Sequence, residues 1–130
     1  MSFLVSVAVV RILLGTVFVA GAVNGFLLMA GRKPFMPVNR DATDFLIRTG
    51  YLYPLVKITE LAAGILLLSG QFVPAGILLL VPIVVNIFFM HLLHDKSLIW
   101  VGALLAGMEF YLLLAYRDYF IPMLQLHAPL

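Results

Sequence analysis

The stretch PAGILLLVPIVVNIFFMHLL, residues 74–93, decides the fold class. It contains no Asp, Glu, Lys or Arg, and about 20 apolar residues are what an α-helix needs to cross the ~30 Å hydrocarbon core of a bilayer. Lipid offers the backbone no hydrogen-bond partners, so a segment at this depth must satisfy its own N–H and C=O groups as a helix. The stretch therefore predicts a transmembrane helix.

Three more apolar segments lie on either side of it, at about residues 3–30, 52–69 and 98–116. The chain of 130 residues is 64% hydrophobic and 11% charged, whereas a typical soluble domain is about 25% charged. A long connection, residues 31–51, follows the first segment, and the other two connections are very short. Short connections force neighbouring helices to run antiparallel. We predict one all-α domain over residues 1–130, an integral membrane antiparallel four-helix bundle.

The first segment is longer than a single crossing requires, and Arg11 divides it. Residues 12–30 alone make about 28 Å of helix, so residues 1–10 either lie in the interface or extend the helix. A cleaved signal peptide would begin with basic residues, but here Arg11 comes after the first apolar run. We therefore expect the segment to be retained, with Arg11 as a snorkelling anchor.

Composition and charge exclude several classes of function. The chain has no cysteine, which excludes disulfides, thiolate metal sites, iron–sulfur clusters and dithiol redox chemistry. Its net charge is +2 and it has no basic run, so nucleic acid is not an expected partner. Half of the Lys and Arg residues lie in the long connection, and the positive-inside rule then predicts that this connection faces the cytoplasm.

Ionisable and amide side chains inside the apolar segments mark the candidate site. A charged group at membrane depth costs at least about 2.5 kcal/mol on insertion scales, so each one needs a reason. The carboxyl group of Glu60 lies in the middle of the second segment, and we expect it to organise the site. The candidate ligand-binding residues are Asn24, Lys57, Glu60, Asn86, His91 and Glu109.

Helical rise places three of these side chains at similar depth. Measured from the side of the long connection, Asn24 lies about 9 Å in, Glu60 about 12 Å and Asn86 about 11 Å. Glu60 shares a stripe of its helix with Gly64, and Glu109, deeper in the fourth segment, also shares a stripe with small residues. Small residues mark faces where helices pack closely. We therefore predict that Glu60, Asn86 and Glu109 point into the bundle.

Three residues of this set have competing interpretations. Lys57 either pairs with Glu60, one turn away, or extends its flexible stem to the surface. Asn86 either donates a hydrogen bond to Glu60 or clamps a neighbouring helix. We expect His91 and His94 at the membrane interface, because an i, i+3 pair lacks the further ligands that a metal or haem site requires. No metal site is predicted.

The long connection is too apolar for a freely solvated linker, since it contains Phe35, Met36 and Phe45. We predict a short helix over residues 41–49, with Asp41 as its N-cap. Such a helix would lie over the polar layer as a lid.

The order and spacing of several motifs resemble a known family over nearly the whole chain. The chain is similar to the DoxX-like family of small four-helix bacterial membrane proteins. It departs from many relatives in having Gln71-Phe72 where they carry a basic residue, and it lacks the cysteines that thiol redox would need. The matching motifs are Arg11-x-x-Leu14-Gly15, Asn24-Gly25-Phe26, Tyr51-x-Tyr53-Pro54-Leu55-Val56-Lys57-x-x-Glu60, Pro82-x-x-x-Asn86 and Tyr116-Arg117-Asp118-Tyr119.

The resemblance implies a four-pass protein of the cytoplasmic (inner) membrane, from a family named after a subunit associated with quinone-linked sulfur oxidation. The first hypothesis is an accessory or assembly factor whose buried polar site binds a lipid, a quinone headgroup or a partner helix. The alternative is a membrane subunit of a quinone-linked oxidoreductase, with Glu60 and His91 relaying protons. Expected partners are membrane lipids, a partner membrane protein or redox complex, or a second copy of the chain. No cofactor beyond a quinone or lipid is indicated.

Overall fold

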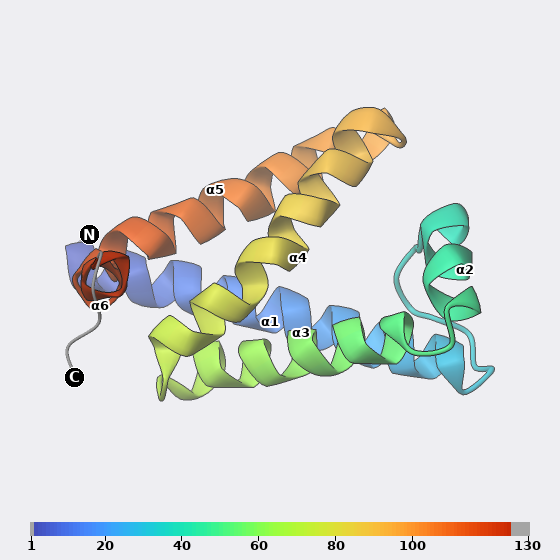
Figure 1. Ribbon diagram of the computed structural model, residues 1–130, viewed down its shortest axis with the longest axis horizontal. Helices are drawn as coiled ribbons and strands as arrows, with labels where there is room; N and C mark the ends of the chain where they lie inside the picture. Colours follow the sequence, from blue (N-terminus) through green and yellow to red (C-terminus); the bar gives the residue numbers. More distant parts are fainter. Residues whose placement is uncertain (1, 126–130) are drawn as a thin grey trace.

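The computed structural model describes residues 2–125, and every regular element in that range is a helix (Figure 1). Within it, four helices are long and apolar enough to cross a membrane, and they pack against one another as antiparallel neighbours. This confirms the predicted all-α membrane bundle. The elements are α1 (Phe3–Met29), α2 (Arg40–Arg48), α3 (Leu52–Ser69), α4 (Val73–Leu93), η1 (Lys96–Leu98), α5 (Ile99–Ala115), α6 (Arg117–Phe120) and η2 (Ile121–Leu124).

The first apolar segment forms one unbroken helix. α1 has 27 residues, which corresponds to about 40 Å of helix. Residues 3–10 therefore extend the helix instead of lying flat in the interface. The Ser2 hydroxyl caps the start of α1 by accepting a hydrogen bond from the Val5 N–H at 3.3 Å.

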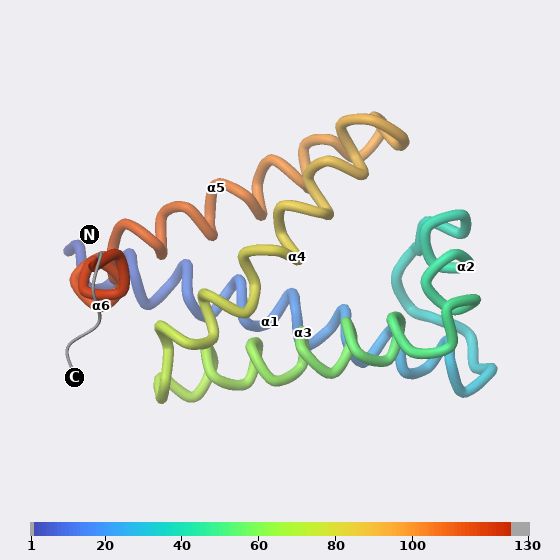
Figure 2. The backbone as a smooth tube through the Cα atoms, viewed as in Figure 1, coloured from blue at the N-terminus to red at the C-terminus, as the bar shows by residue number. Residues whose placement is uncertain are grey.

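The long helices form two antiparallel hairpins that diverge from each other. Figures 1 and 2 show α1 beside α3 and α4 beside α5, with the two pairs meeting where α3 turns into α4. We call this the closed end. The pairs separate toward the other end of the molecule, the open end, where α2 lies. The bundle is therefore a wedge, closed at one membrane surface and open at the other.

Glycines set the closest approach within the first hairpin. A methyl group added at Gly64 would lie 3.0 Å from the Gly15 carbonyl oxygen, and one at Gly15 would lie 3.1 Å from the Gly64 carbonyl oxygen. The backbones of α1 and α3 thus touch, as small residues permit in membrane helices. Gly76 brings α4 equally close to α3, because an added methyl would lie 3.2 Å from the Ala63 carbonyl oxygen.

The closed end is held by a tight turn and by Arg11. Gly70 ends α3 with φ of 76°, a left-handed conformation that glycine adopts without strain, and Phe72 follows with φ of 53°. The guanidinium of Arg11 donates a hydrogen bond to the carbonyl oxygen of Leu67. A cation at a helix C-terminus also interacts favourably with the helix dipole. Arg11 therefore ties α1 to the end of α3, beyond the anchoring role expected from the sequence.

Candidate functional site

The buried face of α3 carries an ion pair. The Lys57 Nζ lies 3.1 Å from Glu60 Oε2, and it also lies 5.4 Å from the centre of the Tyr53 ring. The Glu60 side chain is 6% exposed and that of Lys57 is 17% exposed. Glu60 points inward as predicted. Of the two interpretations of Lys57, the structure shows the pair, with the stem folded back instead of extended to the surface.

Two glycines of α1 make room for this pair. A methyl group added at Gly25 would lie 2.6 Å from Cδ of Lys57, and one at Gly21 would lie 3.8 Å from Glu60 Oε2. The Lys57 stem thus lies directly across Gly25. The Gly21-xxx-Gly25 motif accommodates charged side chains, whereas the backbone contact of this hairpin is made at Gly15 and Gly64. The Lys57–Glu60 pair is consequently covered by α1.

Asn24 is buried as expected, but its amide is occupied by the long connection. Its Oδ1 accepts hydrogen bonds from the backbone N–H of Phe35 at 2.8 Å and of Met36 at 3.0 Å. Its Nδ2 donates to the carbonyl oxygen of Met36 at 3.2 Å. Asn24 therefore fixes the segment that leads to α2.

Asn86 does not face the bundle interior, so that prediction is wrong. Its side chain is exposed, and Glu60 bonds to Lys57 instead of to Asn86. The reason is the divergence of the hairpins. In this part of α4, Val84 and His91 are the buried residues, and α3 no longer covers the face that carries Asn86. Within residues 2–125 the Asn86 amide has no hydrogen-bond partner.

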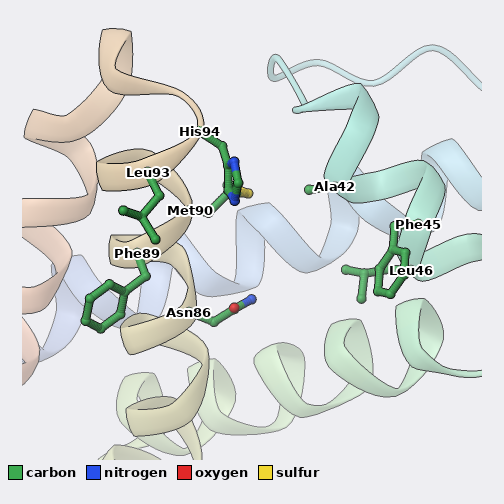
Figure 3. A pocket seen from close by; sticks show the side chains of 8 residues that line it. All are labelled: Ala42, Phe45, Leu46, Asn86, Phe89, Met90, Leu93 and His94. Carbon is green, nitrogen blue, oxygen red and sulfur yellow. The ribbon is translucent and has the colours of Figure 1, made fainter.

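The face of α4 that carries Asn86 forms one wall of a cleft, and α2 forms the other. The volume of this α2–α4 cleft is about 380 Å³. In Figure 3 the side chains of Asn86, Met90 and His94 point from α4 toward α2. The lining residues are Ala42, Phe45, Leu46, Asn86, Phe89, Met90, Leu93 and His94.

The short helix predicted in the long connection exists as α2, but its N-cap is wrong. Asn39, not Asp41, caps the helix, because the extended backbone of Asn39 lets its Oδ1 accept from the Ala42 N–H at 3.0 Å. Asp41 instead lies in the first turn. α2 packs against α3 and faces α4 across the cleft, while the charged pair of α3 is covered by α1.

His91 lies in the last turn of α4 and is buried between α4 and α5. A methyl group added at Gly102 would lie 3.3 Å from its Cδ2, and its Nδ1 lies 3.4 Å from the Asp95 carbonyl oxygen. Glu60 packs against α1, so the structure does not bring His91 and Glu60 together. His94 is exposed and lines the cleft.

The connection after α4 lies near the start of α2. The Ser97 hydroxyl donates to Asp95 Oδ1 at 2.5 Å, and this bond, followed by the nearby Asn39 amide and the His91 charge, lowers the pKa of Asp95. Asn39 is the N-cap of α2. The start of α2 therefore lies near the α4–α5 connection at the open end.

Glu109 is buried on α5 as predicted, with 3% of the residue exposed. Neither of its carboxyl oxygens has a hydrogen-bond partner within residues 2–125. In the same range the only ion pair joins Lys57 to Glu60. Glu109 is thus a second buried carboxyl group, separate from the Glu60 cluster and from the α2–α4 cleft.

Comparisons with known proteins add no relative. No protein-family model, no curated protein and no solved structure matches this chain. Within residues 2–125, no three His, Cys, Asp or Glu side chains lie close enough together to hold a metal ion. The cleft and the buried polar groups are therefore the features that bear on function.

Proposed function

We propose that this chain is a DoxX-like accessory protein of the cytoplasmic membrane that binds an amphiphile, a lipid or a quinone, in the α2–α4 cleft. The observation that carries the proposal is the cleft itself, an apolar hollow beside the membrane-length helix α4 with the Asn86 amide in its wall. The order of the DoxX-like motifs along the chain supports the family assignment.

The size and depth of the cleft suit the polar end of an amphiphile. Its volume of about 380 Å³ falls within the roughly 300–1,000 Å³ of ligand pockets. Asn86 lies eight residues before His94, or about 12 Å along α4, so the two polar side chains sit at different depths. Apolar side chains, among them Phe45 and Met90, form most of the remaining lining of the cleft. A molecule with a chain in lipid could enter this cleft sideways.

Binding is favoured over catalysis by the chemistry of the lining. Among the described residues that line the cleft there is no carboxylate and no thiol, so Asn86 and His94 supply its hydrogen-bonding side chains. The Glu60 carboxylate, the group best suited to proton transfer, is covered by α1 and paired with Lys57. An accessory or assembly role fits this arrangement better than a proton relay through Glu60 and His91.

The test compares the small molecules that co-purify with the parent protein and with a variant whose cleft is filled by a larger side chain. Ala42 lines the cleft, so Ala42→Trp should fill it with an indole ring. Ala103 is exposed on α5, and Ala103→Trp is the matched control. We expect mass spectrometry in mild detergent to find an amphiphile on the parent and on Ala103→Trp, but not on Ala42→Trp.

Two outcomes would overturn the proposal. The same lipids at the same ratio on all three proteins would show that the bound molecules belong to the general lipid shell. Loss of a partner protein, with no change in bound amphiphile, would show that the cleft instead holds a partner helix or a second copy of the chain.

A further inference from the structure

The described lining of the α2–α4 cleft has no fixed charge. Of the residues between 2 and 125 that line it, none is Asp, Glu, Lys or Arg, and His94 is the ionisable one. The charged side chains of α2 lie elsewhere, with Asp41, Asp44 and Arg48 around a separate hollow that also involves Ile47. α2 therefore turns its apolar face to the cleft and its charges away from it.

A charged headgroup would be poorly stabilised in such a cleft. Moving an ion out of water is costly unless an opposite charge and hydrogen bonds compensate it. Proteins that hold phosphate or carboxylate groups usually supply Arg or Lys for this purpose. The cleft has neither, so its chemistry disfavours anionic phospholipid headgroups.

Asn86 supplies hydrogen-bonding groups that suit an uncharged ligand. A carboxamide offers two N–H donors and one carbonyl acceptor, and a ligand that displaces water from the cleft must satisfy them in its place. An ester carbonyl, a ring carbonyl or a hydroxyl group matches this inventory without carrying charge. Asn86 is exposed toward the cleft and is unpartnered within residues 2–125, so it is free to make such bonds.

We infer that the α2–α4 cleft selects an uncharged amphiphile, whose carbonyl or hydroxyl oxygen bonds Asn86 below the membrane surface. This rests on the function proposed above and adds the class of ligand. The apolar part of the molecule lies against Phe45, Leu46 and Met90. His94 lies at the end of α4 and can hydrogen-bond a second neutral polar group nearer the surface.

Tryptophan fluorescence can measure this selectivity directly. Trp100 is the only tryptophan of the chain, so Trp100→Phe gives a silent background. Phe45→Trp then places a reporter in the cleft, and Ile47→Trp places a control reporter on the α2 surface that does not line the cleft. Each protein is reconstituted in phosphatidylcholine vesicles with increasing fractions of either brominated monoacylglycerol or brominated phosphatidylglycerol. Bromine quenches an indole that it contacts.

We expect the monoacylglycerol to quench the cleft reporter at a roughly tenfold lower fraction than the phosphatidylglycerol, as one or two hydrogen bonds would produce. Asn86→Leu, of similar size but without the amide, should raise the fraction of monoacylglycerol needed to quench the cleft reporter by several-fold, because the hydrogen bond is lost. The Ile47→Trp reporter should respond equally to both lipids. A short-chain benzoquinone is then added as a competitor, and displacement of the monoacylglycerol would identify a ring carbonyl as the preferred oxygen.

Failures of the two proposals are distinguishable. If phosphatidylglycerol quenches the cleft reporter as well as monoacylglycerol does, the cleft binds lipid but the inferred selectivity is wrong. Unchanged quenching by monoacylglycerol in Asn86→Leu would also overturn the inference, because the amide would then not bond the ligand. If the cleft reporter and the control reporter respond identically to both lipids, the cleft is not a binding site and the proposed function fails as well.

Discussion

The two hairpins each bury one glutamate in the membrane, but only one of them pairs it. Glu60 in the α1–α3 hairpin is bonded to Lys57, whereas the carboxyl oxygens of Glu109 in the α4–α5 hairpin have no partner within residues 2–125. Both side chains are almost fully buried. Burial alone therefore does not reveal whether a membrane carboxyl group is part of a completed polar cluster.

Local sequence explains the difference. Lys57 lies one turn before Glu60, and α1 supplies glycines over which the pair can lie. One turn before and after Glu109, α5 has Leu105, Ala106, Leu112 and Leu113. A partner for Glu109 must therefore come from outside its own helix. Within residues 2–125, the α1–α3 hairpin supplies a partner for its own buried carboxyl group, and the α4–α5 hairpin does not.

Breaking the Glu60 pair should have the largest effect. We expect Glu60→Leu to lower the free energy of unfolding by about 3 kcal/mol, because it leaves the Lys57 ammonium without its partner. Glu60→Gln should be milder, since the amide still accepts a hydrogen bond. Thermal unfolding in detergent measures both. Lys57→Met combined with Glu60→Leu should recover most of the loss, and a double variant as unstable as the single one would contradict this account.

Filling the space under Lys57 should have the next largest effect. The added methyl of Gly25→Ala would meet the Lys57 stem at 2.6 Å and displace it from Glu60. We expect a loss of about 1–2 kcal/mol, typical of overpacking at a flexible neighbour. Gly107→Ala is the control, because an added methyl there meets nothing within 4 Å. That variant should gain stability from helix propensity. Equal changes for the two variants would mean that the Lys57 stem is not confined by α1.

Replacing Glu109 by leucine should change the free energy of unfolding in the opposite direction to Glu60→Leu. Replacing an unpartnered buried carboxyl group by an apolar side chain of similar size removes its desolvation cost. We expect Glu109→Leu to raise the free energy of unfolding by about 1 kcal/mol in the same detergent assay. If Glu109→Leu instead destabilises the protein, Glu109 has a partner outside the described residues, and the contrast between the hairpins disappears.

Replacing Asn24 should increase the protease sensitivity of the long connection more than it lowers the stability of the bundle. Asn24→Leu removes the acceptor for the Phe35 and Met36 N–H groups, and we expect tryptic cleavage after Arg32 to become roughly tenfold faster in proteoliposomes. Asn24→Asp keeps the two accepted bonds and should remain closer to the parent. The melting temperature should change little in either variant. Unchanged cleavage in Asn24→Leu would show that other contacts hold this segment.

Sequence patterns correctly predicted the features that are set within a single helix. Hydropathy located the spans, and small-residue stripes correctly oriented Glu60 and Glu109. The prediction for Asn86 was wrong because the surroundings of Asn86 depend on the divergence of two hairpins. That divergence is a property of how separate helices pack, and the residue pattern of α4 alone does not contain it.

The cleft could have been recognised in part. The helix at Arg40–Arg48 alternates charged and apolar residues with helical period, and Asn86, Met90 and His94 recur at intervals of four on α4. Each stripe is visible by itself. The structure shows that the two stripes line one cleft, and Asn24 fixes Phe35 and Met36 in the segment that leads to α2.

The divergence of the hairpins also has a consequence for the membrane around the protein. Because the pairs meet at one end and separate at the other, the molecule takes up more area in one leaflet than in the opposite one. A body of that shape strains a flat bilayer less when the wider leaflet is on the outside of a bend. We therefore expect the protein to concentrate where the leaflet at its open end forms the convex side of the bend, and sorting between large and small vesicles would measure this preference.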